Sequence, residues 1–361
     1  MSFTILAINP GSTSTKCALY NDTTEVWKKS VNHRSEDLAG YGRMMDQLEL
    51  RIAAVREGIR EAGIPFADIS AIVGRGGLLK PLEGGVYEVN ARMKSDLASC
   101  KYGIHASNLG ALIADSLASE IGVRAYIVDP VVVDELDPLA RYSGIPEIPR
   151  RSIFHALNQK ATARKAAVSI GKTYMECSMI VAHMGGGTSI GMHVNGRVVD
   201  VNNALDGEGP FAIERAGTVP AGDWMRWILS HQHDPQALQL MLTGKGGLVA
   251  YLGTNEFTLI ERSAEGNGEL DARLSDELIR ALCYQIAKSI VALAAFTNGR
   301  LDAIVLTGGL AFSARVVREI SLRVSFLAPV LHFPGENELE ALAMGARDVL
   351  LGETSARIYE G

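Results

Sequence analysis

The sequence lacks the features that mark several large classes of protein. Its four cysteines, Cys17, Cys100, Cys177 and Cys283, form no CxxC pair, which argues against a zinc site or a disulfide framework. No run of apolar residues approaches the roughly 18 needed for a membrane span. The N-terminal residues also lack the basic and apolar regions of a signal peptide. We therefore expect a cytoplasmic protein whose four cysteines are reduced thiols in the core.

The sequence also has fewer basic than acidic residues. Lys and Arg number 35 against 41 Asp and Glu, which gives a formal net charge of −6. Affinity for a nucleic-acid backbone depends on Lys and Arg that neutralise phosphates, so this balance argues against a general nucleic-acid surface. Aromatic residues make up only 6%, whereas 47% of the residues are hydrophobic and 37 are glycine. This composition indicates a folded enzyme, and 361 residues exceed what one core usually supports, so two domains are expected.

What the sequence does contain is an internal repeat. Residues 4–31 read as an apolar run, a Gly/Ser/Thr loop, a second apolar run, an Asn-Asp turn and a third run. Residues 178–201 repeat this plan, with the turn at Asn195 and Gly196. Asn-Gly between alternating apolar segments is a strong hairpin signal. Each half of the chain is therefore predicted to open with strand, loop, strand, turn and strand.

Helical periodicity alternates with short apolar runs later in both halves. Helices are predicted at 48–62, 107–121, 274–297, 312–324 and 338–351, and strands at 71–73, 125–128 and 303–306. Pro138, Pro146 and Pro149 mark the best boundary between the halves. We predict a duplicated α/β fold of two lobes with a central cleft, a favoured place for a ligand. The N-terminal lobe is 1–148, joined by the C-terminal helix 338–361, and the C-terminal nucleotide-binding lobe is 149–337.

Three loops rich in small residues follow predicted strands. They lie at 9–16, at 185–189 and at 307–310, the last just before a predicted helix. Small residues let backbone N–H groups approach an anion, and a helix N-terminus attracts one. Each loop alone reads more readily as an ordinary turn than as a phosphate site. Because the first two are repeated in register with their strands, we expect them to bracket one polyphosphate.

Several longer runs resemble the acetokinase family. They are ILAINPGSTSTK from Ile5, SIFHALNQK from Ser152, VAHMGGGTS from Val181, ALDGEGPFAIERAGTVPAGD from Ala204 and PGENELEALAMGA from Pro334. The resemblance runs nearly end to end and implies a duplicated ribonuclease-H-like, actin-like ATPase fold. Sugar kinases, actin and the heat-shock chaperone ATPases typically have Asp in the first phosphate loop. Here the residue is Asn9, which favours the carboxylate kinases.

Within the family, the chain looks more like butyrate kinases than acetate kinases, because of Pro10, the GGG run at 185–187 and the GENELEALA run. A branched-chain fatty acid kinase would look similar. The resemblance implies reversible, in-line transfer of a phosphoryl group from ATP to the carboxylate of a short-chain fatty acid, butyrate or isobutyrate. Two alternatives stay open: an acetate or propionate kinase, and a non-catalytic nucleotide switch of the actin or chaperone kind.

The resemblance also implies catalytic residues. A carboxylate is already a nucleophile, so alignment and charge neutralisation carry the catalysis. Arg75 and Arg215 match family arginines that together would surround the charge of the transition state, and a guanidinium fork suits both carboxylate and phosphoryl oxygens. His155 matches a histidine that binds the transferring phosphoryl group, and Asp129 matches a carboxylate that orients Mg²⁺. Without the resemblance, the arginines would read as surface ion pairs and the acid as a helix cap or solvent-facing carboxylate.

The remaining assignments concern ATP, Mg²⁺ and the acid. The predicted ATP- and phosphate-binding residues are Asn9, Gly11, Ser12, Thr13, Ser14, Lys16, His183, Gly185, Gly186, Gly187, Gly308 and Gly309. Mg²⁺, with few direct protein ligands, is assigned to Asp129, Glu338 and Asn9. His105 and Phe154 are candidates for the acid pocket. His183 alone would read as an ordinary core histidine. The family also implies a homodimer or larger homo-oligomer.

Overall fold

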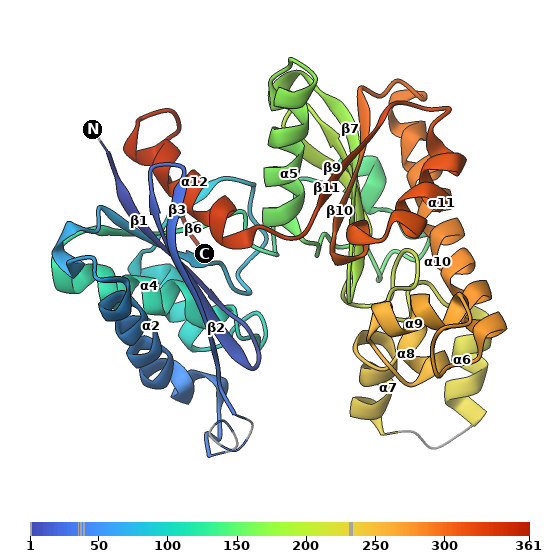
Figure 1. Ribbon diagram of the computed structural model, residues 1–361, viewed down its shortest axis with the longest axis horizontal. Helices are drawn as coiled ribbons and strands as arrows, with labels where there is room; N and C mark the ends of the chain where they lie inside the picture. The colour runs from blue at the N-terminus through green and yellow to red at the C-terminus, as the bar shows by residue number, and fades with distance from the viewer. Residues whose placement is uncertain (1, 35, 37, 39, 231–233) are drawn as a thin grey trace. The chain divides into compact units, whose positions relative to one another are not determined.

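The computed structural model describes residues 2–34, 36, 38, 40–230 and 234–361. Contacts between residues divide the chain into two compact units (Figure 1). Unit 1 holds the described residues up to Asp134, together with Ala156–Asn158 and Asn337–Gly361. Unit 2 holds Glu135–His155 and Gln159–Glu336. The lobe boundaries expected from the sequence, with residues 1–148 and 338–361 in one lobe and 149–337 in the other, stay a prediction.

In the described part of unit 1, one seven-stranded sheet has the order β12-β5-β6-β4-β1-β2-β3. In chain order the strands are β1 (Thr4–Pro10), β2 (Ser14–Asn21), β3 (Thr24–Asn32), β4 (Ala71–Arg75), β5 (Val86–Glu88), β6 (Arg124–Val128) and β12 (Arg357–Ile358). β1 pairs antiparallel with β2 and parallel with β4, and β4 pairs parallel with β6. The carboxyl ends of β1, β4 and β6 therefore lie at one edge of the sheet.

Helices cover both faces of this sheet (Figure 1). They are α2 (Leu48–Ala62), α3 (Ala91–Ala98), α4 (Asn108–Ile121) and α12 (Glu338–Leu350), with short 3-10 turns η1 (Met44–Gln47) and η2 (Phe66–Asp68). Leu6 and Ile8 of β1 share a core with α2, α3 and α4, whereas Ile5 and Ala7 share one with α12. Successive residues of a strand point to opposite faces, so a strand buried on both faces must be apolar throughout.

In the described part of unit 2, a five-stranded sheet has the order β11-β10-β7-β8-β9. The strands are β7 (Ser178–Met184), β8 (Thr188–Val194), β9 (Arg197–Val201), β10 (Ala303–Gly308) and β11 (Val330–Pro334). One face packs on α10 (Ala272–Leu293) and α11 (Ala314–Val324), and the other on α5 (Ala156–Ser169). Short turns η3 (Pro138–Arg141), η4 (Tyr174–Glu176), η5 (Ala294–Thr297) and η6 (Gly309–Phe312) complete the unit.

The two sheets share a five-strand core, which confirms the predicted duplication. The order β3-β2-β1-β4-β6 of unit 1 corresponds to β9-β8-β7-β10-β11 of unit 2. Strand directions correspond as well, since β7 pairs antiparallel with β8 and parallel with β10, and β10 pairs parallel with β11. Both units therefore present the ends of three parallel strands at one sheet edge, the usual ligand-binding edge of α/β sheets.

One helical segment, Ala272–Thr297, is long and apolar enough to cross a membrane by length and composition alone. The packing of this helix in the core of unit 2 accounts for its apolar residues without a membrane. Leu278, Leu282, Ile286 and Ile290 recur every four residues and are buried in the core of unit 2. This is the apolar stripe of a core helix, and the segment carries its apolar residues for that contact.

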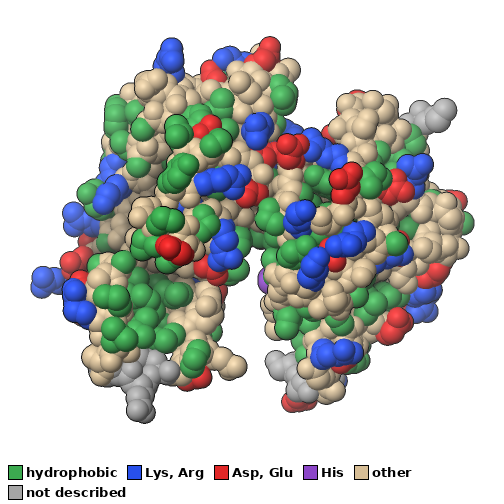
Figure 2. All heavy atoms as spheres, turned by 180° about the vertical axis from the view of Figure 1, so that it is seen from behind, with side chains coloured by type: hydrophobic (Ala, Val, Ile, Leu, Met, Phe, Trp, Pro, Cys, Tyr) green, Lys and Arg blue, Asp and Glu red, His purple; other side chains and the backbone are tan. Residues whose placement is uncertain are grey.

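Between β9 and α10 the chain forms helices that have no counterpart in the repeated core. They are α6 (Ala221–Ser230), α7 (Pro235–Thr243), α8 (Gly247–Leu252) and α9 (Phe257–Ala264). Met225, Leu229 and Tyr251 of this group are 57%, 78% and 64% exposed. Figure 2 shows hydrophobic side chains gathered over this end of unit 2, whereas elsewhere on that face Lys and Arg are interspersed with Asp and Glu.

Candidate active site

In unit 1, three of the predicted site residues stand at the ends of neighbouring parallel strands. Asn9 lies near the end of β1, Arg75 ends β4, and Asp129 follows the last residue of β6. The register pairs Ile8 with Gly74 and Arg75 with Val128, so the three positions are adjacent across the sheet. The sheet topology thus brings these residues to one edge, although they are far apart in the sequence.

Arg75 belongs to a hydrogen-bonded cluster with Asn9 and Glu338. Its Nη1 lies 3.0 Å from Glu338 Oε2 and 3.3 Å from Asn9 Oδ1. The Asn9 amide also donates to the Glu338 carboxylate. Glu338 is the first residue of α12, so the helix that covers one face of the sheet also delivers this carboxylate. A guanidinium, an amide and a carboxylate therefore meet where β1 and β4 end.

Asp129 is held in an unusual backbone conformation. Its φ is +37°, in the left-handed region that non-glycine residues seldom adopt, and its side chain is almost completely buried. One carboxylate oxygen accepts a hydrogen bond of 2.7 Å from the Gly85 N–H, and the Asp129 N–H donates to the Gly85 carbonyl. This reciprocal pair fixes the carboxylate at the end of β6. Backbone strain of this kind is concentrated at functional sites.

The first glycine loop is a tight turn between β1 and β2. The Gly11 N–H donates to the Ser14 carbonyl at 2.8 Å, and Ser12 and Thr13 are exposed. Lys16 is also exposed and lies directly opposite Asn9 in the β1–β2 pair. Residues opposite each other in a ladder share a face of the sheet. The loop, Lys16 and the Asn9 cluster are therefore neighbours within unit 1.

Sequence reasoning missed Arg51, a residue that supports this loop. Arg51 comes from α2, is fully buried, and donates to the carbonyls of Ser12 and Ser14 at 3.1 and 3.0 Å. Its other acceptors, Thr15 Oγ1 and Gln47 Oε1, are also neutral. Burial lowers the pKa of the Arg51 guanidinium from its usual value. A buried cation with neutral partners makes the loop a favourable place for an anion.

In unit 2, His155 and His183 form a stacked pair. Their ring centroids are 3.9 Å apart and the ring planes are inclined by 15°. His183 lies near the end of β7 and is buried, with Nε2 3.7 Å from Glu336 Oε1. His155 precedes α5, and its Nδ1 lies 2.9 Å from Ser189 Oγ. The structure thus brings together two residues whose pairing the sequence did not predict.

The second glycine loop turns between β7 and β8 and is covered by Arg215. The Gly185 N–H donates to the Gly187 carbonyl at 3.0 Å, and Glu214 N–H donates to the Gly186 carbonyl. A Cβ atom at Gly187 would collide with the Arg215 guanidinium, so the arginine lies directly on the loop. Arg215 also donates to the Ala204 carbonyl at 2.5 Å. Burial lowers its pKa, although the charges of Glu214 and Asp206 act in the opposite direction.

The second loop and the third glycine segment line one pocket of about 400 Å³. Gly185, Gly186 and Gly309 contribute to its wall together with Glu336. The rest of the lining is mainly apolar and comes from α9, η6 and their neighbours: Ile213, Phe257, Thr258, Glu261, Leu310, Phe312 and Ser313. Gly308 has φ +89°, and a Cβ there would collide with the Met184 carbonyl, so only glycine fits where β10 meets β7.

Two further residues, His105 and Phe154, were predicted to line the acid pocket. His105 is exposed, and its Nδ1 lies 2.7 Å from Ser107 Oγ. Phe154 is 2% exposed and therefore buried. Their assignment to the acid pocket stays a prediction. Within the part of the chain that the structure describes, no cluster of three or more His, Cys, Asp or Glu side chains is arranged to hold a metal ion.

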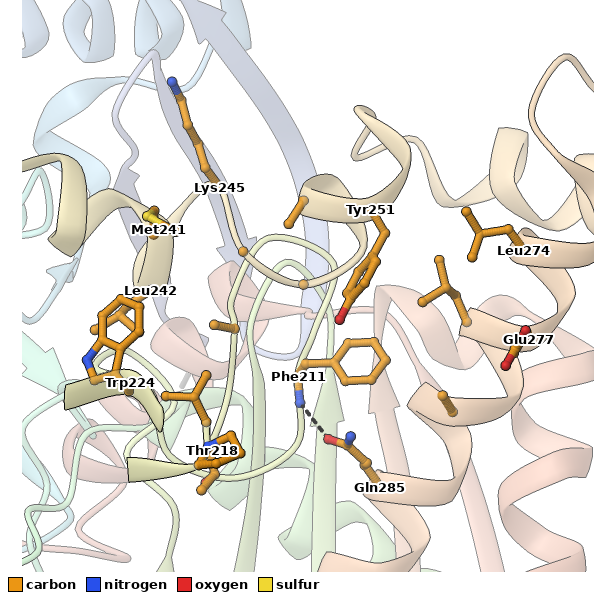
Figure 3. Close-up of a pocket in the computed structure, with 18 residues that line it drawn as sticks. Phe211, Thr218, Trp224, Met241, Leu242, Lys245, Tyr251, Leu274, Glu277 and Gln285 are labelled. Atoms are coloured by element: carbon orange, nitrogen blue, oxygen red, sulfur yellow. Dashed lines mark hydrogen bonds between the residues drawn. The ribbon is translucent and has the colours of Figure 1, made fainter. Parts of the chain in front are cut away.

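A larger apolar pocket, of about 670 Å³, lies among α6, α7, α8 and α10. Figure 3 shows Phe211, Trp224 and Tyr251 around it, with the Phe211 N–H donating to Gln285 Oε1 at 3.2 Å. Among the described residues that line it, none belongs to the predicted site.

Comparison with known proteins supplies the family context. The Acetokinase family model matches residues 144–356. Butyrate kinase 2 of Clostridium acetobutylicum is 47% identical over 360 residues, covering 100% of both chains. A probable butyrate kinase of Coprothermobacter proteolyticus is 49% identical over 360 residues, covering 99% of this chain and 100% of its own. The crystal structure of Porphyromonas gingivalis acetate kinase matches with a TM-score of 0.77 at 17% identity. The match covers 98% of this chain and 100% of the acetate kinase chain. This last match confirms the predicted actin-like ATPase fold.

Proposed function

Because the chain belongs to the acetokinase family, we propose that it transfers the terminal phosphoryl group of ATP reversibly to butyrate and so forms butyryl phosphate. The observation that carries this proposal is the 47% identity to a butyrate kinase over the full length of both chains. The acceptor is a carboxyl group and the donor is ATP. The reaction also uses ADP and the acyl phosphate in the reverse direction.

The cluster in unit 1 supports a role in binding the reacting anions. Arg75 already makes a 3.0 Å ion pair with a carboxylate, that of Glu338, and its side chain is 28% exposed. Its planar guanidinium suits either the carboxylate of the acid or the transferring phosphoryl group. Arg51 adds a buried positive charge behind the first glycine loop. We assign Gly11, Ser12, Thr13, Ser14 and Lys16 to phosphate binding on this basis.

The pocket of about 400 Å³ in unit 2 supports a nucleotide site. Its apolar wall, with Ile213 and Phe312, suits the adenosine group. The amides of Gly186 and Gly187 face the phosphates in this assignment, Gly185 closes the turn and lines the pocket, and Gly308 and Gly309 border the nucleoside. Thr188 Oγ1 is buried with no hydrogen-bond partner within the described chain, which fits a ligand at this loop.

His155, His183 and Arg215 act on the transferring phosphoryl group. The stacked imidazoles stand at the end of β7, and the guanidinium lies on the loop that follows it. In-line transfer spreads negative charge over the phosphoryl oxygens, and fixed donors stabilise that charge. Because butyrate is ionised at neutral pH, the reaction needs no general base. The protein contributes alignment and charge neutralisation.

The residues assigned to Mg²⁺ fit a hard cation. Asn9, Asp129 and Glu338 offer only oxygen atoms as ligands, which Mg²⁺ prefers, and the ion keeps much of its water. Asn9 and Glu338 are in hydrogen-bond contact, and Asp129 is fixed by Gly85. These side chains would hold the ion of an ATP–Mg²⁺ complex, in part through water. When bound, Mg²⁺ neutralises charge on the phosphates. A cytoplasmic location and a homo-oligomeric state belong to the same proposal.

The direct test is an acyl-phosphate assay with hydroxylamine on the purified protein. Acetate, propionate, butyrate and isobutyrate are each supplied with ATP and Mg²⁺, and reactions without ATP serve as controls. The proposal expects the highest kcat/KM with butyrate or isobutyrate. A clear preference for acetate or propionate would make it a kinase of those acids instead. ATP binding without any acyl phosphate would favour the nucleotide-switch alternative.

A further inference from the structure

Behind strand β8, a line of hydrogen-bonded polar side chains runs from η4 to His155. Tyr174 contacts His193, His193 contacts Gln159, Gln159 contacts Ser189, and Ser189 contacts His155. Gln159, Ser189 and His193 are all fully buried. Buried polar groups of this kind are costly unless each donor meets an acceptor. Because each donor must meet an acceptor, the contacts fix the position of each hydrogen along the line.

The orientation of the Gln159 amide is fixed by a backbone carbonyl. Gln159 Nε2 lies 3.0 Å from the Ser189 carbonyl oxygen, which can only accept. The atom at that position must therefore be the NH₂ group. The same NH₂ group lies 2.7 Å from Ser189 Oγ and donates to it. Gln159 Oε1 is left facing His193 Nε2 at 3.0 Å, and it can only accept.

His193 must then carry its hydrogen on Nε2. Burial, together with the charges of Lys160 and Arg164, lowers the pKa of His193 well below its usual range, so the ring is neutral. A neutral ring has one N–H, and the amide oxygen of Gln159 requires it on Nε2. His193 Nδ1 is therefore an acceptor, and the Tyr174 hydroxyl at 2.8 Å donates to it.

The decisive atom is the hydroxyl hydrogen of Ser189. Within the described chain, Ser189 Oγ has three hydrogen-bond contacts: the Gln159 NH₂ group, the His155 backbone N–H at 3.5 Å and His155 Nδ1 at 2.9 Å. The first two are donors, so His155 Nδ1 is the one acceptor for the hydroxyl hydrogen. If Nδ1 carried a hydrogen instead, a fully buried hydroxyl hydrogen would have no acceptor, which is costly.

We infer that Ser189, oriented by Gln159 and His193, holds His155 in the tautomer with its hydrogen on Nε2. His155 Nε2 is then a hydrogen-bond donor while the ring stays uncharged. The inference rests on the proposed function in one respect. If the protein transfers a phosphoryl group, the Nε2–H of His155 is the donor that His155 offers to a phosphoryl oxygen. Ser189, Gln159 and His193 are positioning residues, since they act through His155.

Gly191 provides independent support for the arrangement. It lies in the middle of β8, where glycine weakens a strand and commonly marks a close approach. A Cβ atom at Gly191 would lie 2.5 Å from Gln159 Oε1 and 3.3 Å from His193 Nε2. The missing side chain thus leaves room for the contact between Gln159 and His193.

The test reads the tautomer directly. Wild-type protein with ¹⁵N-labelled histidine is studied by NMR at pH 8, above the usual His pKa of about 6.5, and the His155 signals are assigned with His155→Gln. We expect hydrogen on Nε2 and none on Nδ1. In Ser189→Ala the Nδ1–H tautomer should become populated. Its kcat should fall about tenfold, the range of one lost hydrogen bond, while the KM values for ATP and acid stay within about twofold.

Ser275→Ala is the matched control. Ser275 is also fully buried, and its hydroxyl has no hydrogen-bond partner within the described chain. Its removal should leave both the His155 signals and kcat unchanged. Equal effects of the two substitutions would overturn the inference, as would an unchanged tautomer in Ser189→Ala.

The wild-type NMR spectrum alone shows which ring nitrogen of His155 carries the hydrogen, so it tests the inference even if Ser189→Ala fails to fold. An Nδ1–H or doubly protonated His155 in a protein that makes acyl phosphate overturns the inference and leaves the proposed function intact. Conversely, an Nε2–H His155 in a protein that makes no acyl phosphate upholds the tautomer assignment and overturns the proposed function. The two failures are therefore distinguishable.

Discussion

The repeated cores of units 1 and 2 place different chemistry at corresponding strand ends. Near the end of β1 stands Asn9, whereas at the corresponding position of its counterpart β7 stands His183. β4 ends in Arg75, whereas its counterpart β10 ends in Gly308. Unit 1 therefore presents charged and amide side chains, and unit 2 presents imidazole and bare backbone. The shared topology determines where a ligand can be held, and the terminal residues determine how.

The loops that follow β1 and β7 are supported in different ways. In unit 1 a cation lies behind the loop, since Arg51 is buried and bonded to the carbonyls of Ser12 and Ser14. In unit 2 a cation lies on the loop, since Arg215 covers Gly187. Both arrangements place positive charge next to backbone amides. The two units thus share a fold but differ in how an arginine is placed against the glycine loop.

The largest effect is expected at the charged strand end of unit 1. Arg75→Ala should lower kcat about 10³-fold, because it removes the guanidinium that neutralises charge in the transition state. Acyl-phosphate formation measures this change, and circular dichroism checks folding. Arg124→Ala is the matched control, because Arg124 lies in the neighbouring strand and pairs with Glu88 at 3.0 Å on the surface. A folded Arg75→Ala protein with near wild-type turnover would contradict the assignment.

At the corresponding strand end of unit 2, a substitution of Gly308 should lower the free energy of unfolding. Gly308→Ala puts a side chain at φ +89° and against the Met184 carbonyl, which should cost about 3 kcal/mol of unfolding free energy. Gly309→Ala is the control, since a Cβ there meets nothing within 4 Å. Urea unfolding compares the two variants. Equal stability would mean that β10 and β7 do not need the close approach described for them.

The support of the first loop can be tested with Arg51→Met. The substitution keeps much of the side-chain volume but removes the Arg51 hydrogen bonds to the Ser12 and Ser14 carbonyls, of which, within the described chain, only the Ser14 carbonyl keeps a second donor, the Gly11 N–H. This loss should cost about 2 kcal/mol of stability. The KM for ATP should rise several-fold, because the buried positive charge is lost. Arg60→Met is the control, since Arg60 lies on the same helix and is 75% exposed. A KM for ATP equal in the two variants would argue against an electrostatic role for Arg51.

The smallest effect concerns pH and the buried imidazole of unit 2. His193 has a lowered pKa in the folded protein, so below about pH 6.5 the unfolded chain binds more protons than the folded one. Stability should therefore fall as pH falls below that value, by up to about 1.4 kcal/mol per pH unit from this group. Urea unfolding between pH 5 and 7 measures the slope. His193→Gln should reduce the slope, and an unchanged slope would contradict a neutral buried His193.

Much of the fold could be predicted because its signals are local. The helix predicted at 48–62 is α2, and Gly63 ends it in the left-handed conformation with φ +67°. The hairpin turn at Asn195 and Gly196 joins β8 and β9 as expected. The helices α6 to α9 were not predicted, because they lie outside the internal repeat and have no counterpart in the described part of unit 1. Cys100 is another miss, since it is partly exposed rather than in the core.

The site was harder to predict, because its contacts join distant residues. Motif resemblance selected Asn9, Arg75 and Glu338, but their mutual contacts depend on the pairing of β1 with β4 and on the position of α12. Arg51 gave no signal, because an arginine in an amphipathic helix usually faces solvent. Gln159 also lay unnoticed within the SIFHALNQK run, although its amide orients Ser189.

The position of α12 bears on how the protein is made. Leu339, Leu342, Ala343 and Ala346 fill one side of the core formed by β1, β2, β4 and β6. These residues leave the ribosome only after the whole of unit 2 has been synthesised. Until then, Ile5, Ala7, Ala18 and Val73 lack α12, which supplies most of the helical residues of this core, so the early sheet is exposed to aggregation. Translation must finish before the first-made part of this enzyme can complete its core.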